Sequence, residues 1–197
     1  MADDAPVPLS KMIDAHVALL TKTNGVTKDE RVYREGWPAT VSLMGTSRKR
    51  FPLVIPVDRN IPLTAVADLA RIGFSTVPSV YGDVPAVVAK SAPPRRYVIC
   101  AQDGHGRFGK DLRAEIDGMA VDEMPLTLRE GMFCTLHHGR TEAWRHGLVC
   151  AGSVDAHGRY PVIVAVSTGF YLTAARPDSM LFRYGVARRG IFVPLSI

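Results

Sequence analysis

Apolar positions recur with a helical period in two segments of the chain. Over residues 9–22 they return every three or four residues, and Asn24-Gly25 follows as a stop signal. Residues 127–138 open with a threonine and carry a glutamate three positions later, which is the pattern of a capping box. Residues 64–71, closed by Gly73, and residues 111–117 predict two shorter helices.

Runs of apolar and β-branched residues between glycines and prolines predict strands in the rest of the chain. In chain order these strands cover residues 40–44, 51–57, 86–89, 97–102, 148–153, 160–167, 180–184 and 191–195. Pro52 and Pro56 place the second strand at a sheet edge or a bulge. The turn at residues 155–158 predicts an antiparallel hairpin between two of the strands.

The order of these elements, with a helix first and most strands at the end, predicts an α+β fold. A chain of 197 residues has the length of one domain. We expect a loose N-terminal arm over residues 1–8 and a single globular domain over residues 9–197. In that domain the well-capped helix packs on a largely antiparallel sheet.

Composition narrows the class of protein. Hydrophobic residues make up 47% and charged residues 22% of the chain, which excludes disordered and coiled-coil proteins. Cys100, Cys134 and Cys150 are too few and too scattered for a disulfide framework. The N-terminus lacks the features of a signal peptide, and no apolar run approaches the roughly 20 residues of a membrane span. We therefore expect a cytoplasmic protein without membrane contact.

The net charge of +5 arises mostly in the C-terminal third, and arginine predominates over lysine. Arg48, Lys49 and Arg50 form one basic turn, and Arg188 and Arg189 form another; both are candidates for phosphate binding. Neither has the interleaved aromatic residues or the recognition helix of a nucleic-acid binder. We expect solvated turns there, with nucleic-acid binding through the C-terminal arginines as a third functional hypothesis.

A glycine-rich loop over residues 103–110 resembles two nucleotide-binding patterns loosely. Asp111 stands where the P-loop pattern requires serine or threonine, and its carboxylate would repel a phosphate. No alternation of strands and helices surrounds the loop. We expect a flexible surface loop without a nucleotide cofactor, and a solvated pair of carboxylates at Asp122-Glu123.

Cys134 and His138 lie four positions apart on the predicted helix, on a stripe that we expect to face away from its apolar side. This spacing suits a metal ion or an activated thiol, but two ligands do not make a metal site. A structural thiol, a surface histidine and no bound metal are the expectation. The alternative is an enzyme whose site assembles in three dimensions from Cys134, His137, His138 and His105.

Four short motifs stand in the C-terminal half: the segment from Tyr97, residues 125–131 with the sequence PLTLREG, residues 150–153 and residues 159–162. In this order they resemble domain of unknown function 5701, an uncharacterised actinobacterial family. The resemblance covers roughly residues 85–185. It implies a bacterial source and supplies no activity, because none is assigned to the family.

These observations favour a non-catalytic binding or accessory protein that acts through a protein partner or a small ligand. The last seven residues, 191–197, are almost entirely apolar and must be covered by their own sheet or by another chain. Pro194 suits an edge strand, and an apolar edge is a contact site for a partner strand or a second copy. We expect pairing within the chain's own sheet first, with a protein partner or self-association as the alternative.

Overall fold

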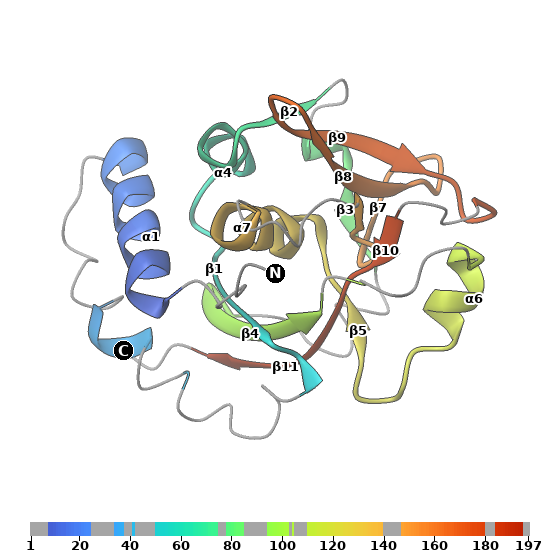
Figure 1. The fold of residues 1–197 in the computed structure, drawn as a ribbon, viewed down its shortest axis with the longest axis horizontal. Coiled ribbons are helices and arrows are strands. Elements are labelled where there is room, and N and C mark those ends of the chain that lie inside the picture. Colours follow the sequence, from blue (N-terminus) through green and yellow to red (C-terminus); the bar gives the residue numbers. More distant parts are fainter. Residues whose placement is uncertain are drawn as a thin grey trace.

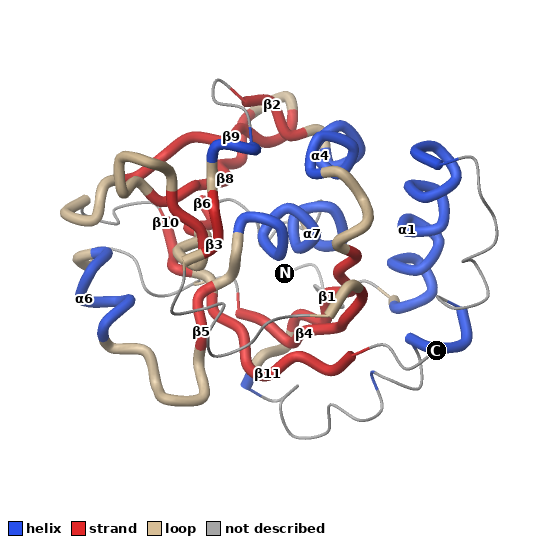
Figure 2. Tube along the Cα trace, turned by 180° about the vertical axis from the view of Figure 1, so that it is seen from behind, coloured by secondary structure: helices blue, strands red, loops and turns tan. Residues whose placement is uncertain are grey.

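Helix α7 (Leu128–His138) lies between two β-sheets at the centre of the fold (Figure 1). The structure is a computed structural model that describes residues 8–24, 34–37, 41, 50–74, 78–84, 94–102, 104, 110–139, 147–179 and 184–194. Helices α1 and α4 lie on one side of α7 and helix α6 lies on the other, as the rear view in Figure 2 also shows. The predicted α+β class is confirmed.

The strands form three sheets instead of the single sheet that we expected. An antiparallel four-stranded sheet has the order β1 (Leu53–Asp58), β4 (Arg96–Gln102), β11 (Arg188–Pro194), β5 (Met124–Pro125). A five-stranded sheet has the order β10 (Tyr184–Val186), β6 (Gly147–Val149), β8 (Tyr160–Val166), β9 (Gly169–Ala175), β2 (Ile72–Phe74), with parallel pairs at both edges. The third sheet pairs β3 (Gly82–Asp83) with β7 (Ser153–Val154).

The helices begin close to where the sequence places them. They are α1 (Leu9–Asn24), α4 (Leu63–Ala70), α6 (Leu112–Asp117) and α7, and the short 3-10 helix η2 (Pro78–Val80) is an addition that was not predicted from the sequence. The capping box of α7 is confirmed: the Thr127 hydroxyl accepts the Glu130 N–H, and the Glu130 carboxylate accepts the Thr127 N–H. The expected end of α4 is wrong, because Arg71, not Gly73, takes the left-handed position after the helix, at φ 56°.

Several predicted strands are confirmed. Strand β1 lies at a sheet edge, as its two prolines indicate, and β6 pairs with β8 in the predicted antiparallel sense. Strand β9 was not predicted, although it pairs with β8 over seven registered positions. The predicted strand at residues 86–89 lies outside the described residues. So do residues 180–183 of another predicted strand and, apart from Val41, the predicted strand at residues 40–44.

Two apolar clusters stabilise this arrangement. The larger cluster surrounds α7 and joins it to both sheets through side chains such as Phe133, Ile99 and Ile163. The smaller cluster lies between α6 and the other face of the five-stranded sheet, around Leu112 and Val162. No helix in the described part of the chain is long and apolar enough to cross a bilayer.

Candidate anion-binding site

The cysteine and histidine candidates on α7 are buried, so their expected place on an outward stripe is wrong. Cys134 has no exposed surface, and His138 is 2% exposed. The reason is that α7 lies between two sheets and has no solvent-facing side at these positions. The Nε2 atom of His138 lies 3.0 Å from the carbonyl oxygen of Val54, which ties the end of α7 to β1.

His137 is likewise part of the interior. Its ring stacks on Phe133, with the ring centroids 6.2 Å apart. Burial, together with the neighbouring His138, lowers the pKa of His137 to about 3, although a hydrogen bond with the backbone of Pro56 opposes the shift. His137 is therefore neutral near pH 7, and it is only 6% exposed. The fourth candidate of this group, His105, lies outside the described residues.

Arg188 does not lie in a solvated turn as expected; it is 2% exposed. It follows Ala187, where the chain passes from β10 in one sheet to β11 in the other. Its guanidinium donates to the Glu123 carboxylate at 2.7 Å, to the Glu115 carboxylate at 2.7 Å and to the Glu115 carbonyl oxygen at 2.9 Å. Glu123 is therefore also buried, which corrects its expected solvation. Arg188 joins α6 to β11.

Arg189 points to the opposite face of β11, as alternation along a strand requires. It is fully buried, so its expected solvation is wrong too. Its Nε lies 3.0 Å from the Glu130 carboxylate, which also accepts a hydrogen bond from the Tyr97 hydroxyl. Burial, with the charge of Glu130, raises the pKa of Tyr97. Both C-terminal arginines are thus committed to buried ion pairs.

The basic turn near residue 50 is described only at Arg50; Arg48 and Lys49 lie outside the described residues. Arg50 is half-exposed, and its guanidinium donates to Asp122 at 2.6 Å and to Glu123 at 2.8 Å. Its charge is therefore neutralised by two carboxylates. Lys110 pairs in the same way with Glu115 at 3.2 Å.

The glycine-rich loop is described only at its two ends. Gly104 is buried, not at the surface as expected, and an added Cβ would meet the backbone of Gly185 at 2.6 Å. This glycine allows two backbone segments to pack closely. Asp111 caps α6, since its carboxylate accepts the Ala114 N–H at 2.9 Å. A carboxylate thus occupies the helix end where a P-loop would hold phosphate.

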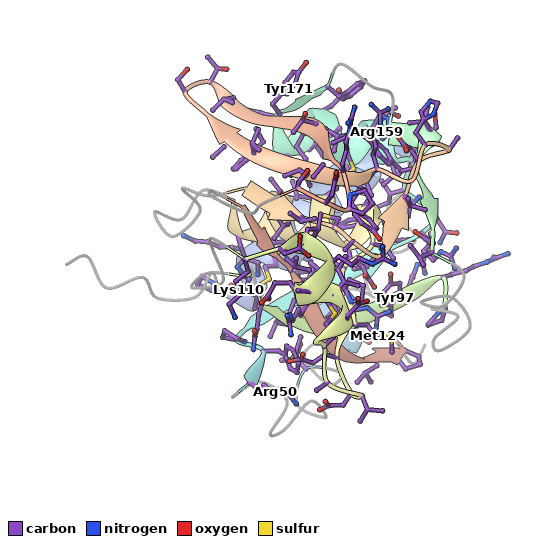
Figure 3. The ribbon with its side chains drawn as sticks, turned by 90° about the vertical axis from the view of Figure 1, so that its right-hand side faces the viewer. Arg50, Tyr97, Lys110, Met124, Arg159 and Tyr171 are labelled. Atoms are coloured by element: carbon purple, nitrogen blue, oxygen red, sulfur yellow. The ribbon has the colours of Figure 1, made fainter. Side chains whose placement is uncertain are left out.

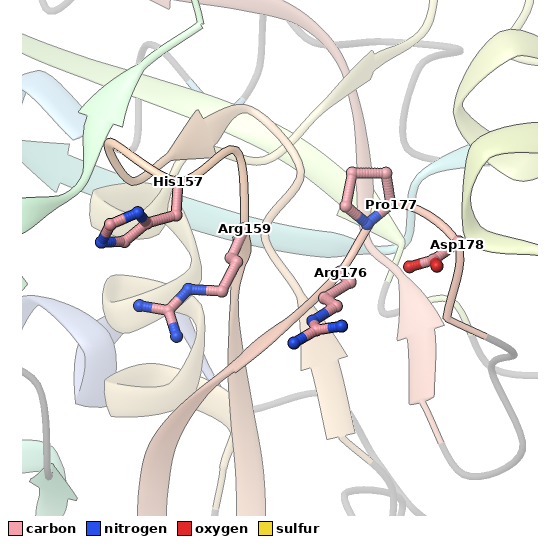
Figure 4. A pocket seen from close by; sticks show the side chains of 5 residues that line it. All are labelled: His157, Arg159, Arg176, Pro177 and Asp178. Atoms are coloured by element: carbon pink, nitrogen blue, oxygen red, sulfur yellow. The ribbon is translucent and has the colours of Figure 1, made fainter.

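A different pair of arginines lies at a cavity of about 400 Å³. Tyr160 faces Ala175 at the end of the β8–β9 ladder. Arg159 directly precedes this pair and Arg176 directly follows it, so the two arginines are the next neighbours across the strands. Figure 4 shows their guanidinium groups on the same side of the strands, with the His157 imidazole beside Arg159. Like charges in this position repel each other unless an anion lies between them.

The turn before β8 holds Arg159 in a fixed orientation. The Asp155 carboxylate accepts the backbone N–H groups of His157 and Arg159 at 2.9 Å and the Nε of Arg159 at 2.7 Å. Gly158 takes φ +72°, a left-handed conformation that favours glycine. Asp155 is buried, and its carboxylate oxygens accept hydrogen bonds within its own turn. The terminal amino groups of Arg159 remain available to the cavity.

The turn after β9 fixes the backbone of Arg176 but not its side chain. The Ser179 hydroxyl accepts the Arg176 N–H at 3.1 Å, and the Arg176 carbonyl accepts the Ser179 N–H at 3.0 Å. Pro177 stands at the turn position that proline favours. In Figure 4 the Asp178 side chain lies beyond Pro177, away from the guanidinium groups. Among the described residues, the Arg176 side chain has no hydrogen-bond or ion-pair partner.

A buried tyrosine lies within the electrostatic reach of this site. The Tyr81 hydroxyl has no hydrogen-bond partner in the described structure. Burial raises the pKa of Tyr81, the charge of Asp155 adds to the effect, and Arg159 opposes it. In Figure 3, Arg159 lies near the top of the molecule and Arg50 near the bottom, with Lys110 between these two heights. The cavity is therefore separate from the ion pairs around Arg188.

A second cavity of about 280 Å³ lies between α6, β5 and β8. Its walls are mostly apolar and include Ile116, Met119 and Tyr160. Both carboxylate oxygens of Glu123, which also lines it, are already bonded to arginine. The described residues contain no cluster of three or more histidine, cysteine or acidic side chains placed to hold a metal ion.

Sequence reasoning missed Arg159, His157 and Arg176 as a site. Arg159 and Arg176 are 17 positions apart and become neighbours only through the β8–β9 ladder, and β9 was not predicted. Had residues 169–175 been predicted as a strand paired with residues 160–166, an arginine directly before the first strand and one directly after the second would have indicated the site.

Comparisons with known proteins identify no relative of this chain. No family model matches it, no curated protein is similar to it, and no solved structure matches it. The resemblance to domain of unknown function 5701 therefore stays a prediction.

Proposed function

We propose that this protein is a non-catalytic binding protein that takes a small anionic ligand between Arg159 and Arg176. The observation that carries the proposal is that the two guanidinium groups lie on the same side of the strands at the end of the β8–β9 ladder and line one cavity. Guanidinium groups are planar, permanently charged donors that match oxyanions. An anion between them would remove their mutual repulsion and satisfy their N–H groups.

The fixed geometry of both turns supports binding. Asp155 holds the Nε edge of Arg159, so fewer side-chain rotations are lost when an anion binds. The Asp155 carboxylate does not compete for the site, because its oxygens accept hydrogen bonds from its own turn and from the Arg159 side chain. Asp155 is therefore a positioning residue in this proposal.

The enzyme alternative receives less support, because Cys134, His137 and His138 are buried around α7. Nucleic-acid binding through Arg188 and Arg189 also receives less support, since both arginines form buried ion pairs. A cytoplasmic location stays a prediction. So does a protein partner at the C-terminal segment, whose described part, β11, pairs with β4 up to Pro194.

Thermal unfolding in a panel of small anions tests the proposal. At constant ionic strength, phosphate, sulfate and citrate should raise the melting temperature relative to chloride, because a ligand that binds only the folded state stabilises it. The increase should vanish in Arg176→Gln and persist in Arg113→Gln, which removes an exposed arginine of α6. An equal increase in both variants, or none in the wild type, would contradict the proposal.

A further inference from the structure

We infer that the ligand of this site is a small organic phosphomonoester, an inference that rests on the proposed anion-binding function. Hydrogen-bond donors around the cavity suit this ligand in number and in placement. The size of the cavity and its uncharged wall suit it as well.

The donors outnumber what a carboxylate accepts. Arg159 uses its Nε for Asp155 and keeps both terminal amino groups, which carry four N–H bonds. Arg176 keeps all five N–H bonds of its guanidinium among the described residues. His157 adds an imidazole, because Asp155 accepts a hydrogen bond only from the backbone N–H of His157 and not from its ring. These three side chains come from two separate turns.

The placement of the donors favours a tetrahedral group. A carboxylate has two oxygens in one plane, and one arginine fork satisfies it. A phosphomonoester has three terminal oxygens that point in different directions, so it can accept hydrogen bonds from donors on both neighbouring strands and from an imidazole. The two charges on the ester at neutral pH also match the two guanidinium groups that line the cavity.

The cavity is larger than a bare phosphate requires. Its volume of about 400 Å³ lies in the range of pockets that hold small organic ligands. The pyrrolidine ring of Pro177 forms its uncharged wall, and Asp178 lines the cavity beyond this ring. This wall suits the carbon skeleton of a sugar or another small ring, while the guanidinium groups hold the phosphate.

Titration calorimetry at about pH 7.5, where the ester carries nearly two negative charges, tests the inference. The probes are ribose 5-phosphate, inorganic phosphate, ribose and succinate, the last being a dicarboxylate of similar charge. We expect ribose 5-phosphate to bind at least about tenfold more tightly than succinate and more tightly than inorganic phosphate. Arg176→Gln should abolish binding, and Arg176→Lys, which keeps the charge but loses the fork, should weaken it severalfold. Arg113→Gln is the control.

The possible failures are distinguishable. Succinate binding as tightly as ribose 5-phosphate would contradict the phosphate assignment and leave anion binding intact. If inorganic phosphate binds as tightly as the ester, the organic part of the ligand contributes nothing to the affinity. If ribose binds as tightly as ribose 5-phosphate, the arginines contribute nothing to it. If none of the anions binds, the inference and the proposed function both fail.

Discussion

Replacing Arg188 with methionine removes the cation that joins α6 to β11. Methionine fills much of the same volume but supplies no donors. The variant loses the two hydrogen bonds to the carboxylates of Glu115 and Glu123 and the one to the Glu115 carbonyl. Two carboxylates are then left in a buried region with one fewer positive charge.

The size of the effect follows from what remains around each carboxylate. Breaking a buried ion pair by removing one partner costs about 3–5 kcal/mol. Glu123 keeps Arg50 and a backbone N–H, and Glu115 keeps Lys110, so we expect the lower end. A loss of about 3 kcal/mol should lower the melting temperature by roughly 6–12 °C in a chain of this size.

Urea unfolding at pH 7 measures the change, with Arg113→Met as the matched control. Arg113 lies 3.9 Å from Asp117 on the exposed side of α6, and its loss should cost at most about 0.5 kcal/mol. A double-mutant cycle adds Glu115→Gln, which should cost less in the Arg188→Met background than in the wild type. An Arg188→Met midpoint equal to that of the control would refute the buried network.

Three further predictions concern stability. Thr127→Ala should cost about 1 kcal/mol, because an N–H in the first turn of α7 loses its acceptor; an unchanged urea midpoint would contradict the cap. Gly131→Ala should cost about 1–3 kcal/mol, because the added Cβ would collide with the Cys150 sulfur; relief by Cys150→Ala in the double variant is the check. Hydrogen bonds from their partners outweigh desolvation and hold the pKa values of Asp155 and Glu123 below their ordinary range. Their contribution is therefore complete at neutral pH and lost as the pH falls below about 4, so acid unfolding should be less steep in Asp155→Asn.

Local patterns allowed much of the fold to be predicted. The capping box of α7 lies within four consecutive residues, and the helix is found where it indicates. The burial of α7 on both sides was not predictable in the same way, because it depends on two sheets that meet around it. Cys134 and His138 were misplaced for this reason.

The candidate site and the buried arginines depend on contacts between distant segments. Arg188 meets its two glutamates across 65 and 73 positions of the chain. Without knowledge of these glutamate partners, a pair of adjacent arginines in the sequence predicts a solvated turn. Arg159 and Arg176 show the converse case, since their proximity requires the register of β8 and β9.

The occupancy of the cavity between Arg159 and Arg176 is the most direct test of this account. Crystals of the protein grown with tungstate, a tetrahedral dianion that scatters anomalously, would locate the bound anion. We predict an anomalous peak within hydrogen-bond distance of both guanidinium groups, and its absence from crystals of Arg176→Gln grown in the same way. Tungstate bound elsewhere, with no peak between these two arginines, would contradict the assignment of this cavity as the anion-binding site.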